Sequence, residues 1–292
     1  MSSNTLVGSS ALSISEEHKN REGIIGIIGT GTIGSMFVHC FSRAFSGRRL
    51  LVAGRDIDAL SRLVESTPEA SAVSVDELAS EADHIFLAIP PEAYVAVLSE
   101  LQHKLKREAV LVSVTNAISM NTVGRITGNP VVKVIPTVAQ QVGRGCTLVV
   151  AGPDAIGEPV ASVVRLISPF SKPLIISDDD SRTASNLAGS ALALFAEFAN
   201  QLVIAHDGRQ GELDKRTLTE MAAETMIAVG TLVGAGYTLD QVITATAAPG
   251  GMTEAAVAVI RRGCSDVVNA AVDETFRQQK LLQRTLDASG VE

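Results

Sequence analysis

The sequence predicts an α/β protein: a Rossmann-type, doubly wound parallel sheet followed by an all-helical C-terminal domain. Three observations predict it. A Gly-x-Gly-x-x-Gly motif ends an apolar run near the N-terminus, strand and helix patterns then alternate, and only helical periodicity follows a charged Asp-Asp-Asp linker. We divide the chain into residues 1–22, a mobile extension, residues 23–180, a dinucleotide-binding domain, and residues 181–292, a helical substrate and dimerisation domain.

The glycine motif is the first predicted binding site. The apolar residues 24–28 are typical of a buried strand, and helical periodicity begins after the motif, over residues 32–46. In a dinucleotide-binding turn the three glycines permit a tight bend, an approaching pyrophosphate and close helix packing; an ordinary turn is the alternative. The pyrophosphate lies at the helix N-terminus, where free N–H groups favour negative charge. We expect cofactor contacts from Gly29, Thr30, Gly31, Thr32, Ile33 and Gly34.

The end of the second predicted strand, residues 49–53, indicates the coenzyme. Gly54 stands where an acidic residue usually binds a free ribose, and Arg55 follows it. Because an arginine suits a 2′-phosphate, we expect NADPH, with NADH the weaker alternative and Arg55 as a cofactor-binding residue. Asp56 keeps NADH open; its other interpretation is the N-cap of the next helix.

Further strands are predicted at residues 83–89, 110–114, 131–135, 147–150 and 174–176, with helices between several of them. Pro90 and Pro91 stop the first of these strands. Ligands of doubly wound sheets bind at the carboxyl ends of the strands. We therefore add these residues to the predicted cofactor site: Ala88, Ile89, Pro90, Thr115 and Asn116.

Composition excludes several classes of partner. A net charge of −8 and a pI near 5.2 argue against nucleic acid. The N-terminus lacks a secretory pattern, and polar residues such as Glu197 interrupt the apolar stretch 187–205, which predicts a buried helix and no membrane span. Three widely spaced cysteines indicate a reducing cytoplasm, and no Cys or His spacing suggests a metal site.

The C-terminal part predicts helices over residues 183–206, 217–233, 238–246, 254–262 and 265–286. Gly234 and Gly263 are placed as C-terminal glycines, and Thr238 with Gln241 forms a capping-box pair. Successive apolar stripes exceed what one small bundle hides. They predict a homodimer or higher homo-oligomer through this domain.

A second glycine site, Ala247-Ala248-Pro249-Gly250-Gly251-Met252-Thr253, precedes a predicted helix. Such a loop offers backbone N–H groups to a small anion such as a carboxylate. The alternative is a plain helix–helix turn with Thr253 as N-cap.

With this loop the sequence resembles the pyrroline-5-carboxylate reductase family. The resemblance rests on the opening glycine motif, the Pro-Gly-Gly-x-Thr loop, the Gly263 turn and the helix 269–282. It implies a substrate site at Gly250, Gly251, Met252 and Thr253, with the Thr253 hydroxyl, as catalytic group, near an imine nitrogen. The chain departs from the family pattern at Ala248, at Leu192 in the segment Ala188-Gly189-Ser190-Ala191-Leu192, and at Thr137 in Ile135-Pro136-Thr137-Val138-Ala139.

The resemblance implies an NADPH-dependent reductase of a small cyclic imine carboxylate, with pyrroline-5-carboxylate to proline, a step of proline biosynthesis, as the first candidate. Imine reduction leaves little acid–base work for side chains, which suits the lack of paired carboxylates. A hydroxyacid dehydrogenase would need a lysine that residues 185–201 lack. Two alternatives stay open: a non-catalytic NADP-binding regulatory protein, and a reductase of another imine or keto acid.

Overall fold

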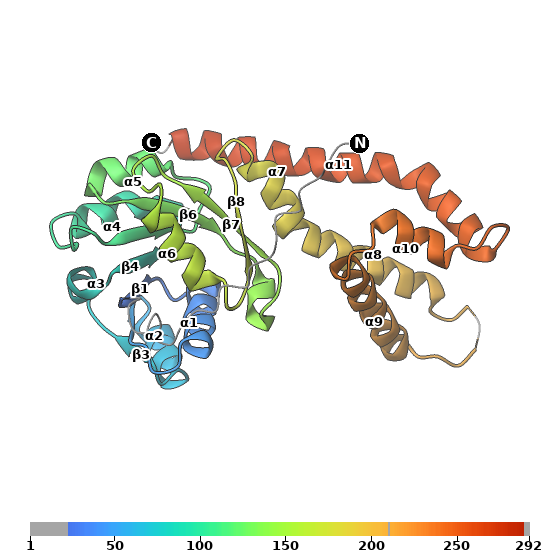
Figure 1. Cartoon of the computed structure of the whole chain (residues 1–292), viewed down its shortest axis with the longest axis horizontal. Helices are drawn as coiled ribbons and strands as arrows, with labels where there is room; N and C mark the ends of the chain where they lie inside the picture. The colour runs from blue at the N-terminus through green and yellow to red at the C-terminus, as the bar shows by residue number, and fades with distance from the viewer. Residues whose placement is uncertain (1–22, 210, 289–292) are drawn as a thin grey trace, which may run out of the picture. The chain divides into compact units, whose positions relative to one another are not determined.

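The computed structural model describes residues 23–209 and 211–288, so the expected N-terminal extension, 1–22, lies outside the described residues. The chain forms two compact units that divide between Ser177 and Asp178 (Figure 1). Each unit has its own architecture. Among the described residues, the strands lie in the first unit, and the second unit is helical.

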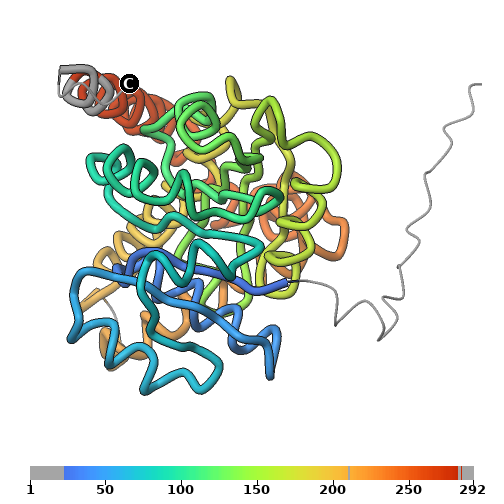
Figure 2. The backbone as a smooth tube through the Cα atoms, turned by 90° about the vertical axis from the view of Figure 1, so that its left-hand side faces the viewer, coloured from blue at the N-terminus to red at the C-terminus, as the bar shows by residue number. Residues whose placement is uncertain are grey.

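The first unit is built on an eight-stranded sheet of order β3-β2-β1-β4-β5-β6-β7-β8. Its neighbouring strands run parallel except for the β6–β7 pair, which is antiparallel. Figure 2 shows the backbone of this unit, in which β1, drawn in blue, pairs with β4. The strands are β1 (Ile25–Ile28), β2 (Leu50–Ala53), β3 (Ala70–Ala72), β4 (His84–Leu87), β5 (Val110–Ser113), β6 (Val131–Ile135), β7 (Cys146–Ala151) and β8 (Lys172–Ile175).

Helices join these strands. They are α1 (Thr32–Ala44), α2 (Ile57–Glu65), α3 (Val75–Glu81), α4 (Tyr94–Leu101), α5 (Met120–Thr127) and α6 (Glu158–Ile167), with short 3₁₀ turns η2 (Pro91–Ala93) and η3 (Val138–Val142). The predicted Rossmann-type fold is confirmed. The sheet is mixed rather than wholly parallel, because η3 and a loop, instead of a crossover helix, connect β6 to β7.

The core explains why these segments form strands. Ile25 and Ile27 are fully buried in an apolar cluster that also contains Phe37 and Phe41 of α1. Gly26 faces the other side, where a Cβ would come within 2.6 Å of a Leu78 methyl group of α3. Because alternate residues of β1 are covered on both faces, the strand is a continuous apolar run, as is typical of buried parallel strands.

The second unit consists of α7 (Ser181–Ser185), the π-helical turn η4 (Asn186–Ser190), α8 (Ala191–His206), α9 (Lys215–Gly234), α10 (Leu239–Thr246) and α11 (Met252–Ala288). Thr238 and Gln241 form the predicted capping box of α10. The left-handed glycine after α9 is Gly236, with φ +101°, rather than the predicted Gly234.

The prediction of two helices separated at Gly263 is wrong. Gly263 lies inside α11, a single helix of 37 residues, and has no positive φ. A glycine costs only about 1 kcal/mol in a helix interior, so good helix-forming neighbours on both sides outweigh it.

One helical stretch, Ser181–His206, is long and apolar enough by length and composition to cross a membrane. The prediction that this region is buried is wrong for the single chain. Only Ala191, Ala199 and Val203 of α8 are buried, and Phe195 is 64% exposed. Within the described residues of one chain, most apolar side chains of this helix remain exposed to solvent.

Candidate coenzyme and substrate sites

The glycine turn between β1 and α1 has the geometry that its sequence predicts. Gly29 has φ +111°, and a Cβ there would lie 2.2 Å from the Ala88 carbonyl oxygen. A Cβ on Gly34 would lie 1.9 Å from the Gly29 carbonyl oxygen. Both positions therefore require glycine, since no side-chain atom fits at such distances.

Gly31 differs from the other two glycines of the motif. It is the N-cap of α1, and nothing in the described part of the chain lies within 4 Å of the point that a Cβ would occupy there. The first turn of α1 contains no acidic residue to oppose an anion. The free N–H groups of Thr32 and Ile33 thus border open space at a helix N-terminus, an arrangement suited to phosphate.

The carboxyl end of β2 shows how Gly54 bears on the choice of coenzyme. A Cβ at Gly54 would lie 2.9 Å from Cγ2 of Thr30, so the larger side chain of an acidic residue would collide there. The Asp56 side chain accepts a hydrogen bond of 2.9 Å from the Ala59 N–H and caps α2, as the second interpretation of this residue predicted. Gly54 therefore offers no carboxylate for a ribose, Oδ1 of Asp56 is engaged in the cap, and Arg55 between them is exposed.

The sheet register brings the other predicted cofactor residues to the same edge. Ile28, Leu87 and Ser113 are paired side by side at the ends of β1, β4 and β5. The segments that follow are the glycine turn, Ala88–Pro90 and Thr115–Asn116, so these predicted residues lie along one edge of the first unit. The Ala88 N–H donates to the Ile28 carbonyl at 2.8 Å and joins two of the segments.

A buried tyrosine that the sequence did not mark lies under this edge. The Tyr94 side chain is 0% exposed, and its hydroxyl oxygen is 2.8 Å from the Leu87 carbonyl oxygen and 3.2 Å from Ser113 Oγ. Burial raises the pKa of Tyr94 to about 12, against the opposing effect of the hydrogen bond with Ser113. The phenol therefore stays neutral and keeps its proton.

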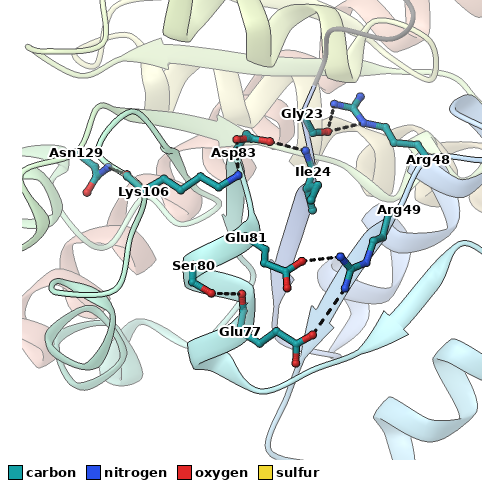
Figure 3. Close-up of polar contacts among 10 residues, drawn as sticks. All are labelled: Gly23, Ile24, Arg48, Arg49, Glu77, Ser80, Glu81, Asp83, Lys106 and Asn129. Atoms are coloured by element: carbon teal, nitrogen blue, oxygen red, sulfur yellow. Dashed lines mark hydrogen bonds and ion pairs between the residues drawn. The ribbon is translucent and has the colours of Figure 1, made fainter.

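The opposite edge of the sheet carries a polar network (Figure 3). Asp83 accepts hydrogen bonds from the Ile24 N–H at 2.6 Å and from Lys106 Nζ at 2.8 Å. Burial acts to raise the pKa of Asp83, but these two hydrogen bonds outweigh it and hold the pKa below its usual value. Arg48 donates to the Gly23 carbonyl at 2.8 Å. These contacts hold the backbone of Gly23 and Ile24, which lead into β1.

His84 lies beside this network and is 7% exposed. Its Nε2 is 2.8 Å from Ser162 Oγ, and burial, with the nearby positive charge of Arg48, lowers its pKa to about 4. A cavity of about 460 Å³ opens next to it, at the amino ends of the strands and so at the edge opposite the predicted coenzyme residues. His84 is therefore a neutral structural residue near neutral pH.

The predicted substrate residues belong to the second unit, in the loop between α10 and α11. Gly250 has φ +73°, and the Gly251 N–H closes a turn onto the Ala248 carbonyl at 2.9 Å. The Ala255 N–H donates to the Gly251 carbonyl, which makes Gly251 the N-cap of α11. Thr253 lies inside the first turn, so its alternative interpretation as N-cap is wrong, and Met252 is 92% exposed.

One hydrogen bond in this loop affects how well the loop can bind an anion. The Gly250 N–H donates a 2.8 Å hydrogen bond to Glu254 Oε2. A carboxylate of the chain itself is thus bound by a donor of the predicted substrate loop. Glu254 was not among the residues predicted from the sequence, although its place three residues beyond the N-cap is the usual position of an acid that reaches back to a backbone N–H.

The segment that departs from the family pattern near α8 has an unusual backbone. Asn186–Ser190 forms a π-helical turn, and Arg182 donates to Asn186 Oδ1 at 2.6 Å just before it. π-helical turns are rare in α-helices and frequently mark functional sites. No metal-binding group of three or more His, Cys, Asp or Glu residues occurs among the described residues.

Comparison with known families defines the class of protein. Residues 24–117 match the family model described as NADP oxidoreductase coenzyme F420-dependent, and residues 178–282 match pyrroline-5-carboxylate reductase dimerisation. The chain is therefore an NAD(P)-dependent oxidoreductase with a Rossmann-type domain and a helical domain of the dimerisation type.

Relatives match over nearly their full length. ComE operon protein 4 of Bacillus subtilis is 24% identical, over 86% of this chain and 93% of the relative. Pyrroline-5-carboxylate reductase 3 of Bacillus subtilis is 23% identical over 88% and 96% of the chains, and the reductase of Mycobacterium leprae is 26% identical over 89% and 97%.

Solved structures share the fold. A pyrroline-5-carboxylate reductase from Coxiella burnetii gives a TM-score of 0.80 at 20% identity, covering 89% of this chain and 98% of the other. The Plasmodium falciparum enzyme, solved with NADP bound, gives 0.76 at 19% identity over 89% and 98%. Taken with the two family models, these relatives show that the chain is similar to pyrroline-5-carboxylate reductases in both of its units.

Proposed function

We propose that the protein is an NADPH-dependent reductase of a small cyclic imine carboxylate, with the conversion of pyrroline-5-carboxylate to proline as first candidate. The observation that carries the proposal is the glycine turn. Gly29 and Gly34 are held by contacts that exclude any side chain, while Gly31 borders open space at a helix N-terminus. The similarity to pyrroline-5-carboxylate reductases supports the reaction class.

The roles of the chain's own residues follow from this reaction. NADPH, when bound, supplies a hydride to the imine carbon, and the electron pair of the C=N bond then moves to nitrogen, which carries a proton. We assign the Thr253 hydroxyl to a hydrogen bond with that nitrogen. Gly250, Gly251, Met252 and Thr253 are assigned to the substrate-carboxylate site; because the Gly251 N–H closes the turn onto Ala248, the donors are the N–H groups of Gly250, Met252 and Thr253. Positioning and exclusion of water then account for most of the rate.

The preference for NADPH rests on Arg55. Thr30 blocks a larger side chain at Gly54, and Asp56 caps α2 through Oδ1, so we assign the coenzyme contact at this end of β2 to the positive charge of Arg55. In an Arg55→Ala variant we expect the Kd for NADPH to rise at least about tenfold, because charge-assisted hydrogen bonds to a phosphate are worth about 1.5–3 kcal/mol.

The matched control is Arg62→Ala, which removes an exposed arginine from the adjoining helix α2. Titration of each variant with NADPH and NADH, followed by nicotinamide fluorescence, checks the prediction. Arg55→Ala is expected to leave the NADH affinity unchanged. An unchanged ratio of NADPH to NADH affinity in this variant would overturn the assignment.

Consumption of NADPH in the presence of five- and six-membered cyclic imino acids tests the substrate. If none of them causes a loss of nicotinamide absorbance, the proposed reaction is refuted.

A specific observation favours a second candidate function. Glu254 already binds the Gly250 N–H, and Ala248 replaces the family's hydroxyl residue. Tight NADPH binding without turnover of any imine or keto acid would favour a non-catalytic NADP-binding regulator.

We further infer that the helical domain forms a homodimer or a higher homo-oligomer. Residues 178–282 match a dimerisation family, and large apolar side chains of α8 and α9, among them Phe195, Phe198, Met221 and Ile227, are exposed in the single chain. A second copy of the same domain would cover them. Glu197 and Gln201, hydrogen-bonded at 2.6 Å on α8, suit a partly polar protein interface better than hydrocarbon.

A further inference from the structure

The β4–α4 connection lies on the predicted coenzyme edge and is held at both ends. At its start the Ala88 N–H donates to the Ile28 carbonyl at 2.8 Å. At its far end, Tyr94 is the first residue of α4, and its side chain reaches back seven residues to the Leu87 carbonyl. Pro90 and Pro91 lie between these two hydrogen-bonded residues and restrict the backbone further.

The direction of the hydrogen bonds at Tyr94 follows from counting donors. A carbonyl oxygen only accepts, so the single phenolic proton goes to Leu87. The Ser113 hydroxyl, 3.2 Å away, must then donate to the phenol oxygen. Tyr94 therefore ties the end of β4 to the end of β5 through one buried oxygen, in a site where burial keeps the phenol protonated.

A shift of the end of β4 would reach the glycine turn directly. The Ala88 carbonyl oxygen is packed so closely on Gly29 that a Cβ there would be 2.2 Å away. A Cβ at Gly34 would also lie 3.3 Å from the Ala88 Cβ. The residue after Leu87 thus forms one wall of the turn that is assigned to the pyrophosphate.

We propose that the Tyr94 hydroxyl is a positioning group for the coenzyme: through Leu87 it fixes Ala88 against the glycine turn and sets the course of residues 88–90 along the coenzyme edge. This inference rests on the proposed binding of NADPH at that edge. Because the Tyr94 side chain is fully buried, its effect on the coenzyme is transmitted through the backbone.

The test is Tyr94→Phe, which keeps the buried ring and removes only the hydroxyl. The Kd for NADPH is expected to rise about three- to tenfold, the factor that corresponds to the net value of one hydrogen bond. The KM for NADPH should rise with it while the KM for the imine stays constant. A purely structural role would instead lower the active fraction and the apparent kcat, and leave both KM values unchanged.

Two further variants complete the experiment. Tyr237→Phe makes the same chemical change at a half-exposed tyrosine of the second unit and should match the wild type. Ser113→Ala keeps the Tyr94–Leu87 bond and should change the Kd less than twofold. Wild-type affinity in Tyr94→Phe, or an equal defect in Ser113→Ala, overturns the inference. Failure of the wild-type protein to bind NADPH would instead refute the proposed function.

Discussion

Replacing Glu254 with Gln tests whether the substrate loop is occupied by the chain's own carboxylate. Glu254 Oε2 accepts the Gly250 N–H at 2.8 Å, and Gly250 is one of the residues assigned to the substrate carboxylate. A substrate carboxylate must either displace Glu254 from this donor or share the loop with it. Both alternatives weaken binding.

The size of the effect follows from the contact. If the substrate shares the loop, two carboxylates lie roughly 5 Å apart, which costs about 1 kcal/mol in a water-like medium. Displacing a charge-assisted hydrogen bond at an exposed site costs about 1 kcal/mol as well. Glu254→Gln removes the charge and keeps a weaker acceptor. We expect the KM for pyrroline-5-carboxylate to fall about five- to tenfold, since about 1.4 kcal/mol is a factor of ten.

The assay is steady-state NADPH oxidation at saturating coenzyme, with the KM for the imine as readout. Asp240→Asn is the control, because it removes an exposed acidic charge from the first turn of α10 in the same unit. The KM for NADPH should not change in either variant. A KM for the imine that stays constant or rises in Glu254→Gln would show that Glu254 does not compete with the substrate.

Two further predictions concern stability and assembly. Because the pKa of His84 is lowered to about 4 by burial and by Arg48, the unfolded chain takes up this proton below the ordinary value of 6.5 while the folded chain does not. The free energy of unfolding should therefore fall by about 3 kcal/mol between pH 6.5 and pH 4 through this group. Chemical denaturation at both pH values should show a smaller loss in His84→Gln than in the wild type or in a His103→Gln control, and equal losses would contradict the assignment. On α8, Phe195→Glu places a charge on the exposed apolar surface, so sedimentation analysis should show dissociated chains, whereas Ile57→Glu on α2 should leave the assembly intact; an unchanged mass for Phe195→Glu would place the interface elsewhere.

The parts of the fold that could be predicted are those that neighbouring residues determine. A buried strand must be apolar throughout, so residues 24–28 show their place in the sheet without tertiary information. Asp56 and Thr238 bond to backbone groups three residues away, and both caps are formed. Gly29 adopts the positive φ that its place in the motif requires.

The parts that could not be predicted depend on distant partners. Strand β3, Ala70–Ala72, has no apolar run and exists because it pairs with β2 at the sheet edge. Helix α6, which was not predicted from the sequence, is formed where Val163 and Ile167 meet the core. The Gly263 break was predicted from a local preference that a long helix can absorb.

The same distinction separates the two halves of the candidate site. The coenzyme residues are largely glycines and strand ends, whose role is steric and follows from backbone geometry. Substrate choice depends instead on which group takes the N–H donors around Gly250, and there a single side chain, Glu254, competes. Arg55→Ala and Glu254→Gln therefore change independent contacts. The free-energy changes that the two substitutions cause should add in the double variant. A strong departure from additivity would mean that the coenzyme site and the substrate loop around Gly250 are coupled. Occupancy of this loop by Glu254 would then control the binding of the coenzyme as well as the binding of the substrate.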